Sequence, residues 1–139
     1  MNEISETELY KKYPSLFSLK DNKTEPIGAY GIECDDGWYE ILSSICFMVE
    51  QHERNIEGNN RYRISQNQNP IDYKPFQFTQ IKEKFGGLRV YSNGGDEYTR
   101  GLIGMARCWS YKTCEICGNK GKTTKHGWLK TICEKCNNR

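Results

Sequence analysis

The sequence predicts an α+β fold: a short antiparallel sheet with two or three helices, followed by a C-terminal zinc ribbon. Three observations support this prediction. Apolar residues recur at helical spacing from Trp38 onward, polar and apolar residues alternate on either side of Gly86-Gly87, and two CxxC pairs follow Thr113. We therefore expect an α+β core domain over residues 1–112 and a zinc ribbon over residues 113–139.

Three segments of the core domain are expected to be helical. The order Ser5-Glu6-Thr7-Glu8 is typical of a capping box and predicts the start of the first helix, which Pro14 ends. Apolar residues from Trp38 to His52 predict the second and strongest helix, with His52 solvated at its end. Asp96 favours an N-cap position and predicts the start of the third helix.

Other features of the core domain lead to further expectations. Residues 55–75 are polar and rich in Asn and Gln, which predicts a long loop. Gly101 and Gly104 weaken the third helix, and close packing against another backbone would explain them. The cysteines outside the CxxC pairs are expected to be buried thiols: Cys34, Cys46 and Cys108.

Charge is distributed unevenly along the chain. Residues 1–58 contain 5 Lys or Arg and 12 Asp or Glu, whereas residues 100–139 contain 9 and 2. An acidic front and a basic tail suggest self-association or an anionic partner, and a dipolar, solvated surface is the alternative. The sequence has no run of 18 apolar residues and no apolar N-terminal segment, so we expect an intracellular protein with reduced thiols and no membrane contact.

The two CxxC pairs have the spacing of a zinc site. Fifteen residues separate the inner cysteines, which is typical of zinc-binding units. Each pair directs two thiolates to one ion, and the two pairs complete a tetrahedron. Four sulfur ligands leave no open position, so we expect a structural zinc ion, and His126 is redundant as a ligand. The expected ligands are Cys114, Cys117, Cys133 and Cys136.

The segment around Gly86-Gly87 predicts a β-hairpin. With these glycines as the turn, Lys84 would face Arg89 and Lys82 would face Tyr91 across the strands. Alternation then places these four polar side chains on one face of the hairpin. The other face would carry Ile81, Phe85, Leu88 and Val90, together with Glu83.

The polar face of this hairpin suggests an anion site. Like charges opposite each other are unfavourable by something on the order of a few tenths of a kcal/mol, and a bound phosphate would reverse that sign. Arg89 would grip the phosphate as a planar fork, with Lys82 and Lys84 as point charges. Tyr91 would offer a hydroxyl or a stacking surface for a base. A solvated sheet face is the alternative.

Binding without catalysis is the expected activity. The sequence contains two histidines, neither beside an obvious nucleophile, and has no P-loop, dinucleotide fingerprint or HExxH motif. Near the end of the third helix, Arg107, Trp109 and Tyr111 would supply further charge or stacking, although Trp109 fits the core equally well. The expected ribbon carries lysines that serve either nucleic-acid binding or solubility: Lys120, Lys122, Lys125 and Lys130.

The stretch "QIKEKFGGLRVY", with "GIECDDGWYEIL" before it and "TCEICG…GWLKTICEKC" after it, resembles a family of small phage and prophage proteins. The chain is similar to the phage anti-CBASS sponge proteins. This resemblance implies a homo-oligomer in the host-cell cytoplasm that binds cyclic dinucleotide immune signals, such as 3′3′-cGAMP, without cleaving them and so inhibits host defence. The alternatives are a zinc-ribbon protein that binds nucleic acid and regulates host or phage transcription, and an inhibitor that docks a host enzyme through its acidic front.

Overall fold

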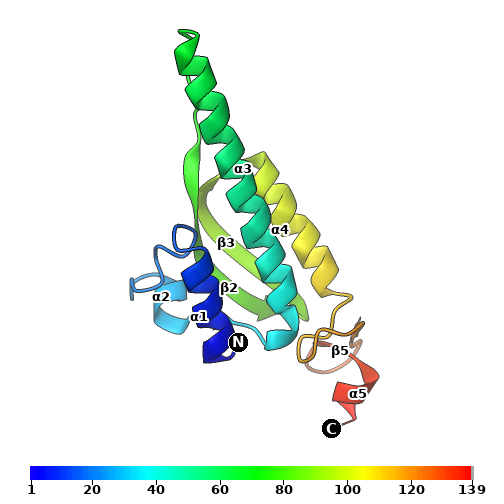
Figure 1. Ribbon diagram of the computed structural model, residues 1–139. Helices are drawn as coiled ribbons and strands as arrows, with labels where there is room; N and C mark the ends of the chain where they lie inside the picture. Colours follow the sequence, from blue (N-terminus) through cyan, green and yellow to red (C-terminus); the bar gives the residue numbers. More distant parts are fainter. Residues whose placement is uncertain (139) are drawn as a thin grey trace.

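The computed structural model describes residues 1–138 and has an α+β fold, as the sequence predicts. Figure 1 shows α3 crossing in front of the sheet, with α4 beside it and the C-terminal unit below. In the described range the helices are α1 (Glu3–Lys12), α2 (Pro26–Tyr30), the 3-10 helix η1 (Asp36–Trp38), α3 (Tyr39–Ser65), α4 (Glu97–Ser110) and α5 (Glu134–Asn137). The strands are β1 (Ile32–Glu33), β2 (Lys74–Lys84), β3 (Gly87–Gly95), β4 (Lys122–Thr123) and β5 (Thr131–Ile132).

The larger sheet has the strand order β1-β2-β3. Strands β2 and β3 form the predicted antiparallel hairpin, and β1 adds a parallel strand that the sequence does not predict. A parallel pair needs a long crossover connection, which η1 and α3 provide. A register shift between Phe78 and Gln80 lets Phe76, Phe78 and Ile81 all lie buried despite their odd spacing.

One hydrophobic core lies between the sheet and the helices. The ring of Phe17 stacks on that of Phe78, with ring centroids 4.7 Å apart. The C-terminal unit has a small core of its own, made of Cys114, Ile132 and Cys136. Helix α3 contributes Ile41, Leu42, Ile45, Cys46 and Val49 to the larger core.

Helix α3 is longer than the sequence predicts. Residues 55–65 continue the helix instead of forming a loop, and the irregular connection to β2 covers only residues 66–73. Hydrogen bonds to that connection support the polar end of the helix. The Asn60 side chain accepts from the backbone N–H of Ile71 at 2.6 Å and donates to its carbonyl at 3.2 Å. In Figure 1 this half of α3 projects beyond the rest of the chain.

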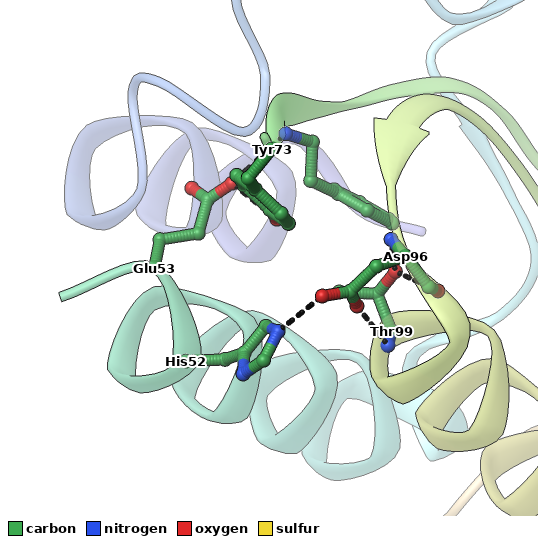
Figure 2. A network of polar contacts seen from close by, with 6 residues as sticks. His52, Glu53, Tyr73, Asp96 and Thr99 are labelled. Carbon is green, nitrogen blue, oxygen red and sulfur yellow. Dashed lines mark hydrogen bonds and ion pairs between the residues drawn. The ribbon is translucent and has the colours of Figure 1, made fainter. Parts of the chain in front are cut away.

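His52 lies in the middle of α3 rather than at its end, and it joins α3 to α4 (Figure 2). Its Nε2 atom is 2.7 Å from Oδ2 of Asp96, the N-cap residue of α4, whose other oxygen accepts the N–H of Thr99 at 3.1 Å. Burial alone would raise the pKa of Asp96, but the hydrogen bonds from His52 and Thr99 lower it. The prediction that Asp96 caps α4 is therefore confirmed, and the structure adds a hydrogen bond between Asp96 and His52 on α3.

Glu53, the next residue of α3, holds the start of β2. Its Oε2 atom accepts hydrogen bonds from the Tyr73 hydroxyl at 2.6 Å and from the backbone N–H of Phe76 at 2.9 Å. Figure 2 shows the side chains of Glu53 and Tyr73 beside the His52–Asp96 pair. Burial, together with the hydrogen bond to Glu53, raises the pKa of Tyr73. Two neighbouring residues of α3 thus anchor two other elements: His52 binds the start of α4, and Glu53 binds the start of β2.

The 3-10 helix η1 fastens the C-terminal unit to the core. The Trp38 indole is fully buried, and its Nε1–H group donates to the carbonyl of Thr113 at 2.9 Å. The backbone N–H of Gly37 donates to the carbonyl of Glu115 at 2.6 Å. A Cβ atom on Gly37 would lie 2.1 Å from the carbonyl oxygen of Cys114, so this close approach requires glycine.

Three local expectations were wrong. Asn2, not Ser5, caps the first helix, and its side chain accepts the N–H of Ser5 at 2.8 Å. Cys108 is exposed, whereas Cys34 and Cys46 are buried as predicted. Gly101 and Gly104 do not pack against another backbone, since a Cβ atom at either position would have no neighbour within 4 Å in the described chain.

We predict that Trp38→Phe lowers the free energy of unfolding by about 2–4 kcal/mol, because it leaves the buried carbonyl of Thr113 without a donor and opens a cavity. Denaturant unfolding measures this change. Trp109→Phe is the control, since Trp109 is 44% exposed, and we expect it to cost less than about 1 kcal/mol. Equal losses in the two variants would contradict the role of Trp38.

We predict that part of the acid sensitivity of the fold comes from Asp96. Its lowered pKa means that ionised Asp96 stabilises the fold above its ordinary pKa of 3.8, and this stability is lost as the pH falls through the lower folded-state pKa. Asp96→Asn keeps an N-cap but removes the titration, so unfolding free energy should fall less steeply below about pH 4. Asp72→Asn, at an exposed position, is the control.

Candidate functional site

The C-terminal unit brings four cysteines together. Their Sγ atoms all lie within 4.8 Å of one another, and those of Cys117 and Cys133 are 3.6 Å apart. A tetrahedral ion with metal–sulfur distances of about 2.3 Å requires sulfur atoms about 3.8 Å apart, so the arrangement fits one ion. These are the predicted residues, and together they can hold a metal ion: Cys114, Cys117, Cys133 and Cys136.

Backbone geometry preorganises this four-cysteine cluster. Gly118 has φ +82°, and its N–H donates to the carbonyl of Cys114 at 2.9 Å, which closes the first turn. In the second pair, the N–H of Cys136 donates to Sγ of Cys133 at 3.4 Å at the start of α5. Burial would raise the pKa of Cys114, but backbone N–H groups, led by that of Cys117, lower it to about 6. The Cys114 sulfur therefore favours the thiolate form, in which cysteine binds metal ions.

His126 is not part of the four-cysteine cluster. It is exposed in the loop between β4 and β5, as expected for a residue of the ribbon loop. These two strands pair antiparallel, with Lys122 opposite Ile132 and Thr123 opposite Thr131. The hairpin and the four cysteines are compatible with the predicted zinc ribbon.

The β2–β3 hairpin turns one residue earlier than predicted. Phe85 and Gly86 form the two-residue turn, with φ values of 54° and 81°, so Lys84 pairs with Gly87. Phe85 is consequently 63% exposed rather than part of the apolar face. Arg89 lies opposite Lys82 and not opposite Lys84, so the predicted pairing was wrong.

Apart from Phe85, the predicted faces of the hairpin are correct, because the pairing is shifted by two residues and the side-chain period is two. Ile81 and Leu88 are buried, while Lys82 and Arg89 lie on the opposite, polar face. Lys84 and Tyr91 belong to the same face, and both are exposed. Tyr91 pairs with Gln80 rather than Lys82.

Tyr111, directly after α4, joins the hairpin face to the end of that helix. Its Oη atom accepts a hydrogen bond from Nη1 of Arg89 at 3.1 Å and one from Nε of Arg107 at 3.4 Å. Gly87 makes room for the ring, since a Cβ atom there would lie 2.5 Å from Oη of Tyr111. The hydrogen bond from Arg107 is the main cause that lowers the pKa of Tyr111, and it outweighs partial burial.

We call Lys82, Arg89, Arg107 and Tyr111 the cationic cluster. In residues 1–138 no ion pair joins any of its three cations to a carboxylate. Glu33 is the carboxylate closest in register, because it lies beside Lys82 in the parallel β1–β2 pair. Three cationic side chains therefore share this face of the described chain without an ion pair to a carboxylate.

Trp109, a predicted ligand-binding residue, lies away from the cationic cluster. It lines a small apolar hollow between α3 and α4, together with Ile45, Met48 and Met105. Two further hollows in the described surface lie over α1 and over the ribbon, so neither involves the cationic cluster. None of these three hollows is lined by a residue of the cationic cluster.

No family model, curated protein or solved structure matches the chain. Among the described helices, none has the length and apolar character needed to cross a membrane. The four-cysteine cluster and the cationic cluster are the two features of the described chain that bear most directly on function.

We predict that the purified protein binds one metal ion per chain and that Cys117→Ser loses most of it, because three thiolates no longer close the coordination sphere. Elemental analysis after dialysis measures the ratio of metal to protein. Cys108→Ser is the matched control, because this exposed cysteine lies outside the four-cysteine cluster and should keep the full metal content. Equal metal content in both variants would contradict the site.

Proposed function

We propose that this is a phage-encoded, non-enzymatic binding protein that takes up a phosphate-bearing nucleotide at the cationic cluster. The family resemblance implies cyclic dinucleotides such as 3′3′-cGAMP, whose sequestration would silence a host immune signal. One observation carries the proposal. Two guanidinium groups from different elements, those of Arg89 and Arg107, converge on the Tyr111 oxygen, and neither pairs with a carboxylate in the described chain.

The chemistry of the cationic cluster suits a phosphate. Because Oη of Tyr111 accepts hydrogen bonds from both arginines, its own proton is free to donate to a phosphate oxygen. The lowered pKa of this hydroxyl makes it a stronger donor. Each guanidinium keeps further N–H groups for the same anion, and hydrogen bonds between charged partners are about twice as strong as neutral ones. A bound phosphate would also relieve the repulsion between Lys82 and Arg89.

The same groups favour retention of the ligand over cleavage. The cationic cluster contains no histidine and no metal ligand, which are common means of activating water. Tyr91 lies farther along the same sheet face and is 45% exposed, so its ring is accessible for stacking against a base. Binding and holding an intact nucleotide is the activity that these side chains best support.

A second copy of the chain would complete the nucleotide site. Small-molecule sites are usually concave, whereas none of the three hollows described above is lined by the cationic cluster. The resemblance implies a homo-oligomer with ligands near subunit contacts. Complementary charge supports such an assembly, because residues 1–58 are strongly acidic and residues 100–139 strongly basic.

We propose zinc as the ion of the four-cysteine cluster. Four thiolates that can coordinate one ion tetrahedrally are the donor set of structural zinc sites. They leave no coordination position for a catalytic water. Cys114, Cys117, Cys133 and Cys136 would hold the ion. Its contribution would be to the folding of the C-terminal unit, whose own apolar core is small. Elemental analysis that finds iron in place of zinc would contradict this assignment.

We predict that Arg89→Gln and Arg107→Gln each weaken binding of 3′3′-cGAMP by about 10- to 100-fold, because each removes a charged hydrogen bond to phosphate. Isothermal titration calorimetry measures the affinity. Arg100→Gln is the matched control: it is also on α4, but its guanidinium lies 3.9 Å from Glu97 and makes no contact with Tyr111. Its affinity should equal that of the unmodified protein.

The fate of the ligand separates binding from catalysis. Heating the complex should release intact 3′3′-cGAMP, identified by chromatography. Degraded ligand would overturn the non-enzymatic proposal. No binding of 3′3′-cGAMP or of related cyclic and linear nucleotides at micromolar protein would overturn the nucleotide site itself.

A second candidate function is a zinc-ribbon protein that binds nucleic acid and regulates transcription. The position of the hairpin turn favours it. Thr131 Oγ1 donates to the carbonyl of Gly86 at 2.6 Å, so the hairpin turn beside Lys84 contacts the ribbon directly. Basic residues of the hairpin and the ribbon therefore belong to adjoining segments, as an extended polyanion would require. Oligonucleotide binding that weakens as salt increases tests this candidate.

A further inference from the structure

The tip of the ribbon exposes a tryptophan that the fold does not use. Trp128 is 83% exposed, and the small core of the ribbon consists of Cys114, Ile132 and Cys136 with Cys133 packed against it. An indole is large and apolar and is usually well buried, so one left in solvent at a hairpin tip points to a role in binding. Trp128 contributes nothing to the packing of either core.

Hydrogen bonds hold the tip in a defined shape. Thr124 Oγ1 accepts from the N–H of Lys130 at 3.1 Å and donates to the carbonyl of Trp128 at 3.3 Å. The N–H of Thr124 also donates to the carbonyl of Lys130 at 2.9 Å. These bonds close the loop that carries Trp128, so the exposed ring is attached to a preorganised backbone.

The surroundings of Trp128 are cationic. Residues 118–132 contain no Asp or Glu, and no ion pair in the described chain engages the lysines of this segment. A surface hollow of about 700 Å³ runs along the ribbon and is lined by Lys120, Lys122 and Lys135, with Glu134 the one acidic residue among its lining. The lysines between the CxxC pairs are Lys120, Lys122, Lys125 and Lys130.

We infer that the ribbon binds single-stranded nucleic acid, with Trp128 as the platform on which a base stacks and the lysines as phosphate contacts. A stacking aromatic side chain combined with basic residues that contact phosphates is the means by which proteins hold single strands without strong sequence preference. A duplex fits less well, because its bases are stacked on one another and leave no face free for the indole. The inference rests on the second candidate function and does not depend on the cationic cluster.

The test is fluorescence anisotropy with a labelled oligothymidylate of about 12 nucleotides and with the duplex of the same strand, using the full-length, metal-loaded protein. We expect the single strand to bind at least about 10-fold more tightly than the duplex. Trp128→Ala should weaken single-strand binding by about 10-fold or more, and Trp128→Phe by less, because phenylalanine keeps a stacking face. Lys125→Gln should reduce the slope of log K against log salt by about 0.7.

Controls keep the outcome interpretable. Trp128→Ala should unfold at the same temperature and hold the same amount of metal as the unmodified protein, since its side chain is exposed. Single-strand binding that Arg89→Gln abolishes and Trp128→Ala leaves unchanged would overturn the inference while leaving nucleic-acid binding intact. No binding of either oligonucleotide would overturn the second candidate function as well. Binding to anionic vesicles in place of oligonucleotides would overturn it too, because tryptophan beside lysine also suits a lipid surface.

Discussion

The hydrogen bond from Trp38 to Thr113 anchors the start of the C-terminal unit to the main core. The indole is buried in the main core, and its partner carbonyl immediately precedes Cys114, the first residue of the four-cysteine cluster. Gly37 lets the backbone of η1 approach this segment closely. A small unit with a core of three residues has little apolar surface of its own, so its position depends on this attachment and on the ion that its cysteines can hold.

Glycines also position the cationic cluster. Gly87 leaves space for the Tyr111 ring, which brings Oη within reach of Arg89 on β3 and Arg107 on α4. Ser110 fixes the approach of these two elements, because its Oγ accepts the buried N–H of Leu88 at 2.9 Å. Contacts in the core therefore position the two elements, and the arginine side chains reach Tyr111 from them.

Patterns with a fixed period were predictable from the sequence, and features set by tertiary contacts were not. The CxxC spacing gave the four cysteines, and the two-residue alternation gave the polar face of the hairpin even though the turn lies one residue earlier. Phe85 adopts a positive φ, which is uncommon for a non-glycine residue, so Gly86-Gly87 was the natural choice of turn. The polar end of α3 is helical because contacts such as Asn60 with Ile71 support it, and the two-residue strand β1 is too short to have a pattern.

The bond between Thr131 and the carbonyl of Gly86 has a thermodynamic consequence. Thr131 lies two residues before Cys133 in the ribbon, and Gly86 lies in the turn of the hairpin that carries Lys82 and Arg89. An ion held by the four-cysteine cluster would stabilise the segment that carries this donor, and with it the turn. Metal affinity and the affinity of the proposed anion site would then be linked, and by reciprocity each ligand would strengthen binding of the other by the same factor.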